Sequence, residues 1–316
     1  MPILRKPDYL PYAEPKVVGF VTAKDGVKLR YGVWASTAAD CKGTILLLQG
    51  RREYVEKSYE TIQDFQKKGF SVLSFDWRGQ GGSDRLLEDP RKGYVDGFED
   101  YVLDLETIIQ DVALPDCIAP FYIVAHSTGA LVALLAAPKI PNKIRRMVLC
   151  SAFLGFGEQP ISQSAIKLLS GLMSTFGLGD FYLSGSAAAI DKKLQQDNTL
   201  TSDKARFDAC VRFVKDHPEL SLGGPTANWV FSACKAMDQL EDPEFTSDIT
   251  IPTLFLLAGN DRIVDNGAIE TLAARLRSGS SLTIDGAEHE LFHEADQYRE
   301  QCLAAINAFI PGSAGG

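Results

Sequence analysis

The chain has 316 residues, of which 45% are hydrophobic and 23% are charged, and its formal net charge is −9. This length accommodates one large α/β domain with an insertion, or two modest domains. The acidity and the lack of a sustained basic stripe argue against nucleic acid as a partner and against tight electrostatic docking on anionic lipid. Hydrophobic or transient contact with a membrane surface stays open.

The six cysteines are dispersed and form no C-x-x-C pair, so neither a zinc ribbon nor a disulfide framework is predicted. The N-terminal residues Met-Pro-Ile-Leu-Arg-Lys lack the apolar core of a signal peptide, and no stretch approaches about 18 uninterrupted apolar residues. We therefore expect a soluble protein of the cytoplasm. The sequence does not predict an oligomeric state.

The chain opens with an expected hairpin in which Val17–Thr22 and Val27–Trp34 flank the turn dipeptide Asp25-Gly26. Short apolar runs then predict buried strands at Thr44–Leu48, Ser71–Phe75, Phe121–Val124, Arg146–Leu149, Thr253–Leu257 and Ser281–Ile284. Most are separated by helical patterns, at Val55–Lys68, Phe98–Gln110, Gly129–Ala137 and Asn266–Arg277. This alternation favours an α/β fold with a mostly parallel sheet covered by helices on both faces.

From about Leu154 to about Asp242 the alternation stops. Helix-like stretches replace it at Ile161–Phe176, Asp203–Asp216 and Asn228–Leu240. We predict a helical cap at 154–242, inserted between two parts of the core at 1–153 and 243–316. Its position is consistent with a place over the carboxyl ends of the strands, where open α/β sheets bind ligands. A last helix is expected near Leu291–Ile310.

Residues 125–129 read Ala-His-Ser127-Thr-Gly, between a predicted buried strand and a helix of small residues. This resembles G-x-S-x-G, in which a sharp strand-to-helix turn exposes a nucleophilic serine. Ala125 replaces the first glycine of the pattern, and its methyl group fits only if the facing side chain is small. The competing interpretation is a serine that merely ends a buried strand.

A serine hydroxyl needs a base within hydrogen-bond reach and a carboxylate that orients the base. His289 follows the last predicted strand, and Asp261 follows the strand before it, so both belong to the same edge of the sheet. We predict His289 as the base and Asp261 as the acid. Asp265 is an alternative acid that can instead cap the following helix, whereas Asp285 lies too close to the end of its strand to reach across easily.

Backbone N–H groups of Thr128 and Arg51 are the expected oxyanion donors. Arg51 belongs to the loop Gln49-Gly-Arg-Arg52, which follows the Thr44–Leu48 strand. Two interpretations of the Arg51 and Arg52 side chains stay open. They bind a substrate phosphate, or they form local salt bridges with residues such as Glu53 and Glu56.

Two other motifs compete with this assignment. His289-Glu-Leu-Phe-His293 matches the zinc motif H-E-x-x-H, but His289 is expected in a loop rather than within a helix, and a third ligand is poorly placed. We therefore predict no metal and take His293 as an exposed or rim residue. The glycines at 79–82 do not have the spacing of a dinucleotide-binding loop and are interpreted as a turn beside the site.

Taken together, these motifs resemble α/β-hydrolases of the monoacylglycerol-lipase-like group, and within it bacterial lysophospholipases associated with the inner membrane. The resemblance spans nearly the whole chain. Its motifs are Gln49-Gly-Arg-Arg-Glu-Tyr54, Phe75–Ser83, the Ser127 elbow, Gly259-Asn-Asp261, His289 and two runs of the cap, Asn198–Phe207 and Leu222–Trp229. Gln49 departs from the pattern, since many relatives have histidine there.

The resemblance implies an eight-stranded α/β-hydrolase fold with a helical cap and cofactor-free cleavage of esters of single-chain lipids, at or near the inner membrane. The substrate would be a small amphiphilic ester, either a lysophospholipid or a monoacylglycerol. Substrate-binding candidates are Gln49, Arg52, Leu172 and Phe176, although apolar stripes of this kind are more often the core of the cap itself. Alternatives with the same triad are an esterase, lactonase or aminopeptidase acting on small substrates, and an inactive fold that binds a ligand.

Overall fold

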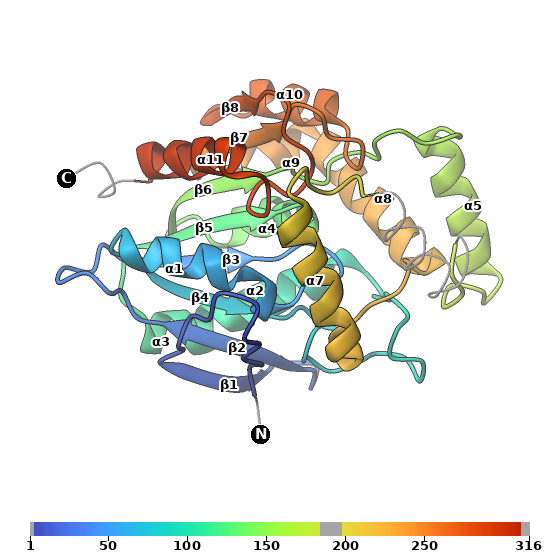
Figure 1. Ribbon diagram of the computed structural model, residues 1–316. Coiled ribbons are helices and arrows are strands. Elements are labelled where there is room, and N and C mark those ends of the chain that lie inside the picture. The colour runs from blue at the N-terminus through green and yellow to red at the C-terminus, as the bar shows by residue number, and fades with distance from the viewer. Residues whose placement is uncertain (1–2, 184–197, 311–316) are drawn as a thin grey trace.

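The computed structural model describes residues 3–183 and 198–310. Its centre is one eight-stranded sheet with the strand order β1-β2-β4-β3-β5-β6-β7-β8 (Figure 1). The strands are β1 (Val17–Thr22), β2 (Lys28–Trp34), β3 (Thr44–Leu48), β4 (Ser71–Phe75), β5 (Phe121–His126), β6 (Ile144–Cys150), β7 (Thr253–Ala258) and β8 (Gly279–Ile284). The β1–β2 and β2–β4 pairs are antiparallel, and all other pairs are parallel.

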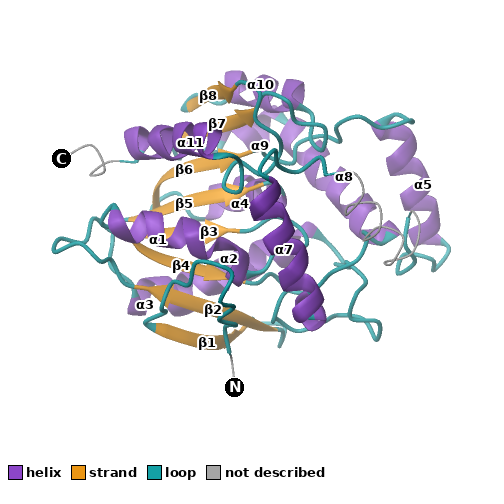
Figure 2. Cartoon of the chain, viewed as in Figure 1, coloured by secondary structure: helices purple, strands orange, loops and turns teal. Residues whose placement is uncertain are grey.

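Helices cover both faces of this sheet (Figure 2). On one face, α1 (Tyr59–Lys67) and α11 (Asp296–Phe309) bury residues such as Phe65 and Ile306 against strand residues such as Val124. The other face is packed against α2 (Phe98–Ile108), α4 (Thr128–Ala136), α8 (Ala227–Glu241) and α10 (Asn266–Arg275). Successive side chains of a strand point to opposite faces, which explains why the central strands β3 and β5 are apolar at nearly every position.

Between β6 and β7 the described residues form helices and loops. The helices are α5 (Gln163–Thr175), α7 (Lys204–Asp216), the 3₁₀ turn η4 (Pro218–Leu220), α8 and α9 (Pro243–Ser247). Figure 1 shows α5 beside α8 at the periphery of the molecule, with the sheet on the other side of α8. The division of the chain at 154 and 242 stays a prediction, and part of the predicted cap lies outside the described residues.

Four shorter segments complete the helical inventory of the described residues. The 3₁₀ turn η1 (Val55–Ser58) leads directly into α1, a π-helical turn (Ile109–Ala113) and α3 (Leu114–Asp116) extend α2, and η3 (Ala137–Lys139) extends α4. Within the part of the chain that the structure describes, no helix combines the length and apolarity that crossing a bilayer requires.

Most expected elements are found, with one clear difference at the C-terminal end. The hairpin and the six parallel-sheet strands lie where the sequence predicts them, with ends that shift by no more than a few residues. The last helix, expected from Leu291, begins only at Asp296. Residues 289–293 are instead a buried loop whose polar groups bond to other parts of the chain, so the apolar pattern there reflects burial rather than helix.

Candidate active site

Ser127 occupies the turn between β5 and α4. Its backbone is in a strained conformation, with φ 52° and ψ −116°, which few non-glycine residues adopt. The turn is crowded, because a Cβ on Gly129 would lie 2.5 Å from the backbone oxygen of Gln49. Ala125, the departure from the motif, is fully buried in β5 between Leu48 and Leu149 of the neighbouring strands. The strand therefore accommodates this methyl group, and the elbow has the geometry expected of a nucleophile turn.

His289 and Asp261 form a hydrogen-bonded pair at the carboxyl ends of β8 and β7. Nδ1 of His289 lies 2.8 Å from Oδ2 of Asp261, and the Asp261 side chain is fully buried. A carboxylate can only accept, so Nδ1 carries the proton and Nε2 is left as an acceptor for a hydroxyl proton. Burial alone would raise the pKa of Asp261, but the hydrogen bond from His289 and the Ile263 and Val264 N–H groups lower it below its usual value.

The base lies next to the elbow. The ring of His289 is 4.8 Å, between centroids, from the ring of His126, the residue that precedes Ser127. Nε2 of His126 is also 3.3 Å from the backbone oxygen of His289. Ser127 and His289 line the same cavity. Asp265, the alternative acid, caps α10 by accepting from the Gly267 N–H at 2.8 Å.

The loop that follows β3 lies directly against the elbow, since a Cβ on Gly50 would lie 3.2 Å from Cβ of Ser127. The Gly50 N–H donates to the Glu53 carboxylate, whereas the Arg51 N–H has no acceptor in the described part of the chain. Thr128 is the first residue of α4, so no earlier turn of the helix offers its N–H an acceptor. These two N–H groups are the predicted oxyanion donors.

Side chains of the turn after β4 hold the Gln49–Arg52 loop in place. Trp77 Nε1 donates to the Gln49 oxygen at 2.9 Å, and Gln80 Nε2 donates to the Gly50 oxygen at 3.0 Å. Trp77 and Gln80 belong to the glycine-containing segment that we interpreted as a turn beside the site. That segment fixes the backbone from which the Arg51 N–H projects.

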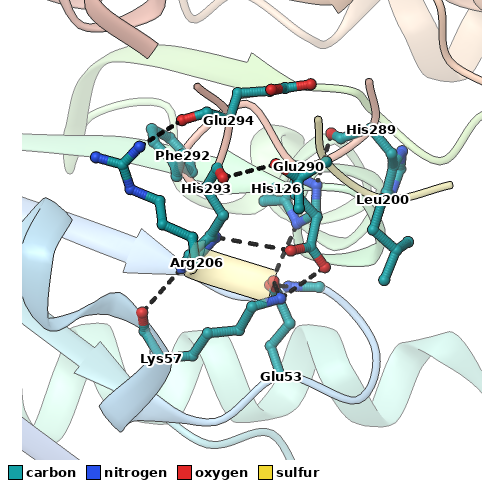
Figure 3. Close-up of polar contacts among 12 residues, drawn as sticks. Glu53, Lys57, His126, Leu200, Arg206, His289, Glu290, Phe292, His293 and Glu294 are labelled. Carbon is teal, nitrogen blue, oxygen red and sulfur yellow. Dashed lines mark hydrogen bonds and ion pairs between the residues drawn. The ribbon is translucent and has the colours of Figure 1, made fainter. Parts of the chain in front are cut away.

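A buried charged network lies behind the elbow (Figure 3). Lys57 Nζ is 2.8 Å from Glu53 Oε1 and 2.6 Å from Glu290 Oε1. Glu53 also lies 3.2 Å from Nδ1 of His126, so one carboxylate connects the oxyanion loop to the residue before Ser127. Burial alone would raise the pKa of Glu53, but Lys57 and His126 keep it well below its usual range. Sequence reasoning missed this network, although Glu290 belongs to the motif that was considered for zinc.

The two histidines of H-E-x-x-H have different partners. His289 pairs with Asp261, whereas Nε2 of His293 lies 2.9 Å from the backbone oxygen of Lys57. Both precede α11, so they do not share the helix face that the zinc motif requires. His293 is buried and therefore not exposed, whereas its place in the lining of the cavity agrees with the alternative expectation of a rim residue. One ring nitrogen of His293 and one carboxylate oxygen each of Glu53 and Glu290 lie within 4.8 Å of one another. The Lys57 ammonium bonds both of these carboxylates.

The segment before α7 covers the loop that carries the base. The Glu290 N–H donates to the Leu200 oxygen at 2.7 Å, and Thr201 Oγ1 donates to the His293 oxygen at 2.7 Å. Ser202 Oγ donates to Glu294. These residues belong to the run Asn198–Phe207, which carried part of the family resemblance, and here they bond to the residues that follow His289.

A cavity of about 940 Å³ opens over Ser127, near the upper end of the usual range for small-molecule sites. Its described apolar lining includes Phe153, Phe156, Ile166, Leu183, Trp229 and Val230. Leu172 and Phe176, two substrate-binding candidates, are not among its described lining residues. They are 48% and 77% exposed, on α5 and at its end. Ile166 of the same helix lines the cavity instead. The binding role of Leu172 and Phe176 stays a prediction.

Gln49 and the two arginines differ in their surroundings. Gln49 is buried away from the cavity, and its Nε2 faces Ser74 Oγ at 3.5 Å. Arg51 and Arg52 both line the cavity. Glu53 is bound by Lys57 and His126, and Glu56 pairs with Arg30 at 2.7 Å. Neither of these carboxylates is therefore the partner of Arg51.

The sheet and the strand-to-helix elbow define an α/β-hydrolase fold, in which Ser127 lines the same cavity as His289 of the His289–Asp261 pair. The chain belongs to the Hydrolase_4 family, described as serine aminopeptidase, S33, which matches residues 39–296. It is 33% identical over 304 residues to the probable lysophospholipase L2 of Haemophilus influenzae, covering 96% of this chain and 95% of the relative. It is 25% identical over 311 residues to rat monoglyceride lipase, covering 97% and 93%.

Solved structures share the fold at low sequence identity. A soluble variant of monoglyceride lipase from Saccharomyces cerevisiae, in complex with a substrate analog, superposes with a TM-score of 0.75 at 17% identity, covering 99% of this chain and 100% of the other. The monoacylglycerol lipase of Paleococcus ferrophilus gives a TM-score of 0.69 at 22% identity, covering 89% and 97%. These likenesses confirm the expected fold.

Proposed function

We propose that this protein is a serine carboxylic ester hydrolase that cleaves single-chain lipid esters, either lysophospholipids or monoacylglycerols. The observation that carries the proposal is the hydrogen bond of 2.8 Å between His289 and Asp261 beside a cavity that Ser127 also lines. The lysophospholipase and monoglyceride lipase relatives supply the substrate class.

The proposed reaction proceeds in two steps on Ser127. His289 Nε2 takes the proton of the serine hydroxyl as Oγ attacks the ester carbonyl, and the N–H groups of Arg51 and Thr128 stabilise the oxyanion. The protonated imidazole, held by Asp261, then gives its proton to the leaving alcohol. Water attacks the acyl-enzyme with the same histidine as base and releases the fatty acid. Each oxyanion donor contributes about 2.7–4 kcal/mol to transition-state stabilisation.

The experiment that tests the reaction type is labelling by a fluorophosphonate probe, which needs an activated serine. Wild type should be labelled, and Ser127→Ala should lose both labelling and ester turnover. Equal labelling of the two proteins would mean that another residue is the nucleophile. Chelator-sensitive turnover without labelling would favour metal chemistry instead.

Acyl-chain length tests the lipid assignment. The apolar lining around Trp229 and Ile166 should bury successive methylenes of an acyl chain. Each buried methylene contributes about 0.8 kcal/mol, so kcat/KM on a series of monoacylglycerols should rise by about fourfold per methylene until the cavity is full. A flat response would eliminate the lipid assignment.

The family description favours a second candidate, hydrolysis of peptide amides by the same triad. An aminopeptidase needs an anionic or polar group that binds the free α-amino terminus. Turnover of amino-acid arylamides exceeding that of matched acyl esters would support this candidate over the lipid esterase. The same comparison with small esters and lactones distinguishes the remaining alternatives.

We also propose transient contact of the protein with a lipid surface through the outer face of α5. Leu168 and Leu169 are 65% and 48% exposed, and Phe176 just beyond the helix is 77% exposed. A double variant, Leu168→Gln with Phe176→Gln, should bind neutral phosphatidylcholine vesicles about tenfold more weakly. Leu282→Gln changes an exposed leucine on β8 and is the matched control. Equal binding by all three proteins would contradict the proposal.

A further inference from the structure

The side chain of Arg51 is a half-buried cation at the wall of the cavity over Ser127, and it has no carboxylate partner among the described residues. Its Nη2 donates to the Gly223 oxygen at 2.5 Å, and its guanidinium carbon lies 5.3 Å from the centroid of the Trp229 ring. Its Nε is buried and has no hydrogen-bond partner. Within residues 3–183 and 198–310, Arg51 forms no ion pair. Arginines removed from water usually pair with an anion, and the described residues supply none to Arg51.

The guanidinium of Arg51 faces a cavity whose lining has charges of both signs. Arg52 and Arg91 line it together with Glu53, Glu158 and Glu290. Burial, with a smaller contribution from the Arg52 charge, lowers the pKa of Arg51 to about 9. The contacts with Gly223 and Trp229 fix the guanidinium in place, so an anion that enters the cavity meets a donor that is already oriented.

We propose that the Arg51 guanidinium binds the phosphate of a lysophospholipid headgroup while the acyl ester lies at Ser127. This inference rests on the proposed function and names the substrate class within it. The backbone N–H of Arg51 is the proposed oxyanion donor, so the phosphate site lies one side chain away from the reacting carbonyl. In a glycerol-based lysophospholipid, the glycerol unit alone separates the acyl ester from the phosphate group.

A guanidinium and a phosphate form charge-assisted hydrogen bonds, often in pairs. A monoacylglycerol has a hydroxyl where the lysophospholipid has its phosphate, so it would leave the Arg51 guanidinium without a countercharge. A site built for a charged partner discriminates strongly against an analogue that lacks it. The same residue would therefore stabilise the oxyanion through its backbone and select the headgroup through its side chain.

The test compares two substrates with the same acyl chain, 1-palmitoyl lysophosphatidylethanolamine and 1-palmitoylglycerol, in the same detergent micelles. Arg51→Gln keeps the backbone N–H and removes the cation. We expect the ratio of kcat/KM on the lysophospholipid to kcat/KM on the monoacylglycerol to fall on the order of 10- to 100-fold, whatever loss the two substrates share through the oxyanion loop. Arg51→Lys keeps the charge without the planar guanidinium, so its preference for the lysophospholipid in kcat/KM should lie between those of wild type and Arg51→Gln.

Arg277→Gln removes an exposed positive charge between α10 and β8 and controls for changes in net charge at the micelle surface. Equal losses on both substrates in Arg51→Gln would assign Arg51 a purely structural role through Gly223 and would overturn the proposal, as would no loss on either. If wild type cleaves neither lipid while a short acyl ester is turned over, the proposed function fails and not merely the assignment of Arg51.

Competition distinguishes a lipid headgroup from free phosphate. Glycerol 3-phosphate should inhibit wild-type cleavage of a short neutral ester and should inhibit Arg51→Gln at least tenfold more weakly. Inorganic phosphate should inhibit wild type less than glycerol 3-phosphate, because it lacks the glycerol that continues toward Ser127. Inhibition by inorganic phosphate that equals or exceeds that by glycerol 3-phosphate, with unchanged lipid discrimination in Arg51→Gln, would show a free-anion site and overturn the headgroup assignment.

Discussion

Replacing Lys57 by methionine removes the ammonium that lies between two buried carboxylates. The Lys57 side chain is 9% exposed, and those of Glu53 and Glu290 are 11% and 10% exposed, so water replaces little of the lost interaction. Breaking a buried ion pair by removing one partner costs about 3–5 kcal/mol. We expect Lys57→Met to lower the free energy of unfolding by this amount at pH 7, measured by urea denaturation.

The pH dependence of this loss has a definite sign. Burial alone would raise the pKa of Glu290, but Lys57 and His293 together lower it below its usual value. In wild type this carboxylate therefore adds stability above its unfolded pKa, which is lost as the pH falls. Without Lys57, burial and the neighbouring Glu53 would raise the folded-state pKa above about 4.3. The destabilisation of Lys57→Met should then grow as the pH rises from about 5 to 8.

Two further variants separate the charge effect from the loss of packing. Adding Glu290→Gln to Lys57→Met removes one of the facing carboxylates and should recover roughly half of the loss. Lys67→Met changes a lysine of α1 that is 70% exposed, 3.8 Å from Asp64, and should cost less than about 0.5 kcal/mol. A Lys57→Met loss below about 1 kcal/mol, or one equal at pH 5 and pH 8, would refute this account of the network.

The remaining predictions concern the elbow and the acid. Asp261→Asn should reduce kcat on a chromogenic ester by about 10,000-fold with little effect on KM; retention of a tenth of the activity would exclude Asp261 as the orienting carboxylate. Gly129→Ala places a Cβ 2.5 Å from the Gln49 oxygen and 3.0 Å from the Leu48 oxygen, so it should lower both thermal stability and kcat, the latter by at least tenfold; unchanged kcat would mean that the oxyanion loop tolerates displacement. Ala125→Gly should change kcat less than about twofold and cost roughly 1 kcal/mol of stability, because glycine weakens a strand; a large gain in kcat would show that the methyl group distorts the elbow.

The amino-acid sequence determined the sheet and the order of the chemical groups along it. Thr44–Leu48 and Ser71–Phe75 are strands with the predicted bounds. A short, mostly apolar run between turn residues favours a strand buried on both faces. Parallel connection brings the carboxyl ends of strands to one edge. The proximity of Asp261 and His289 follows from that rule, although the residues are 28 positions apart.

Only the tertiary structure decided which apolar side chains line the cavity and which charged side chains pair with residues distant in the sequence. Periodicity shows that α5 has an apolar face, but Ile166 points into the cavity while Leu172 and Phe176 face outward. Likewise, Lys57 and Glu290 are 233 positions apart, and no local pattern predicts their pairing. The physical reason is that hydrogen bonds and ion pairs depend on separations of a few ångströms, which the packing of whole elements sets, whereas sequence patterns encode only the preferences of each element.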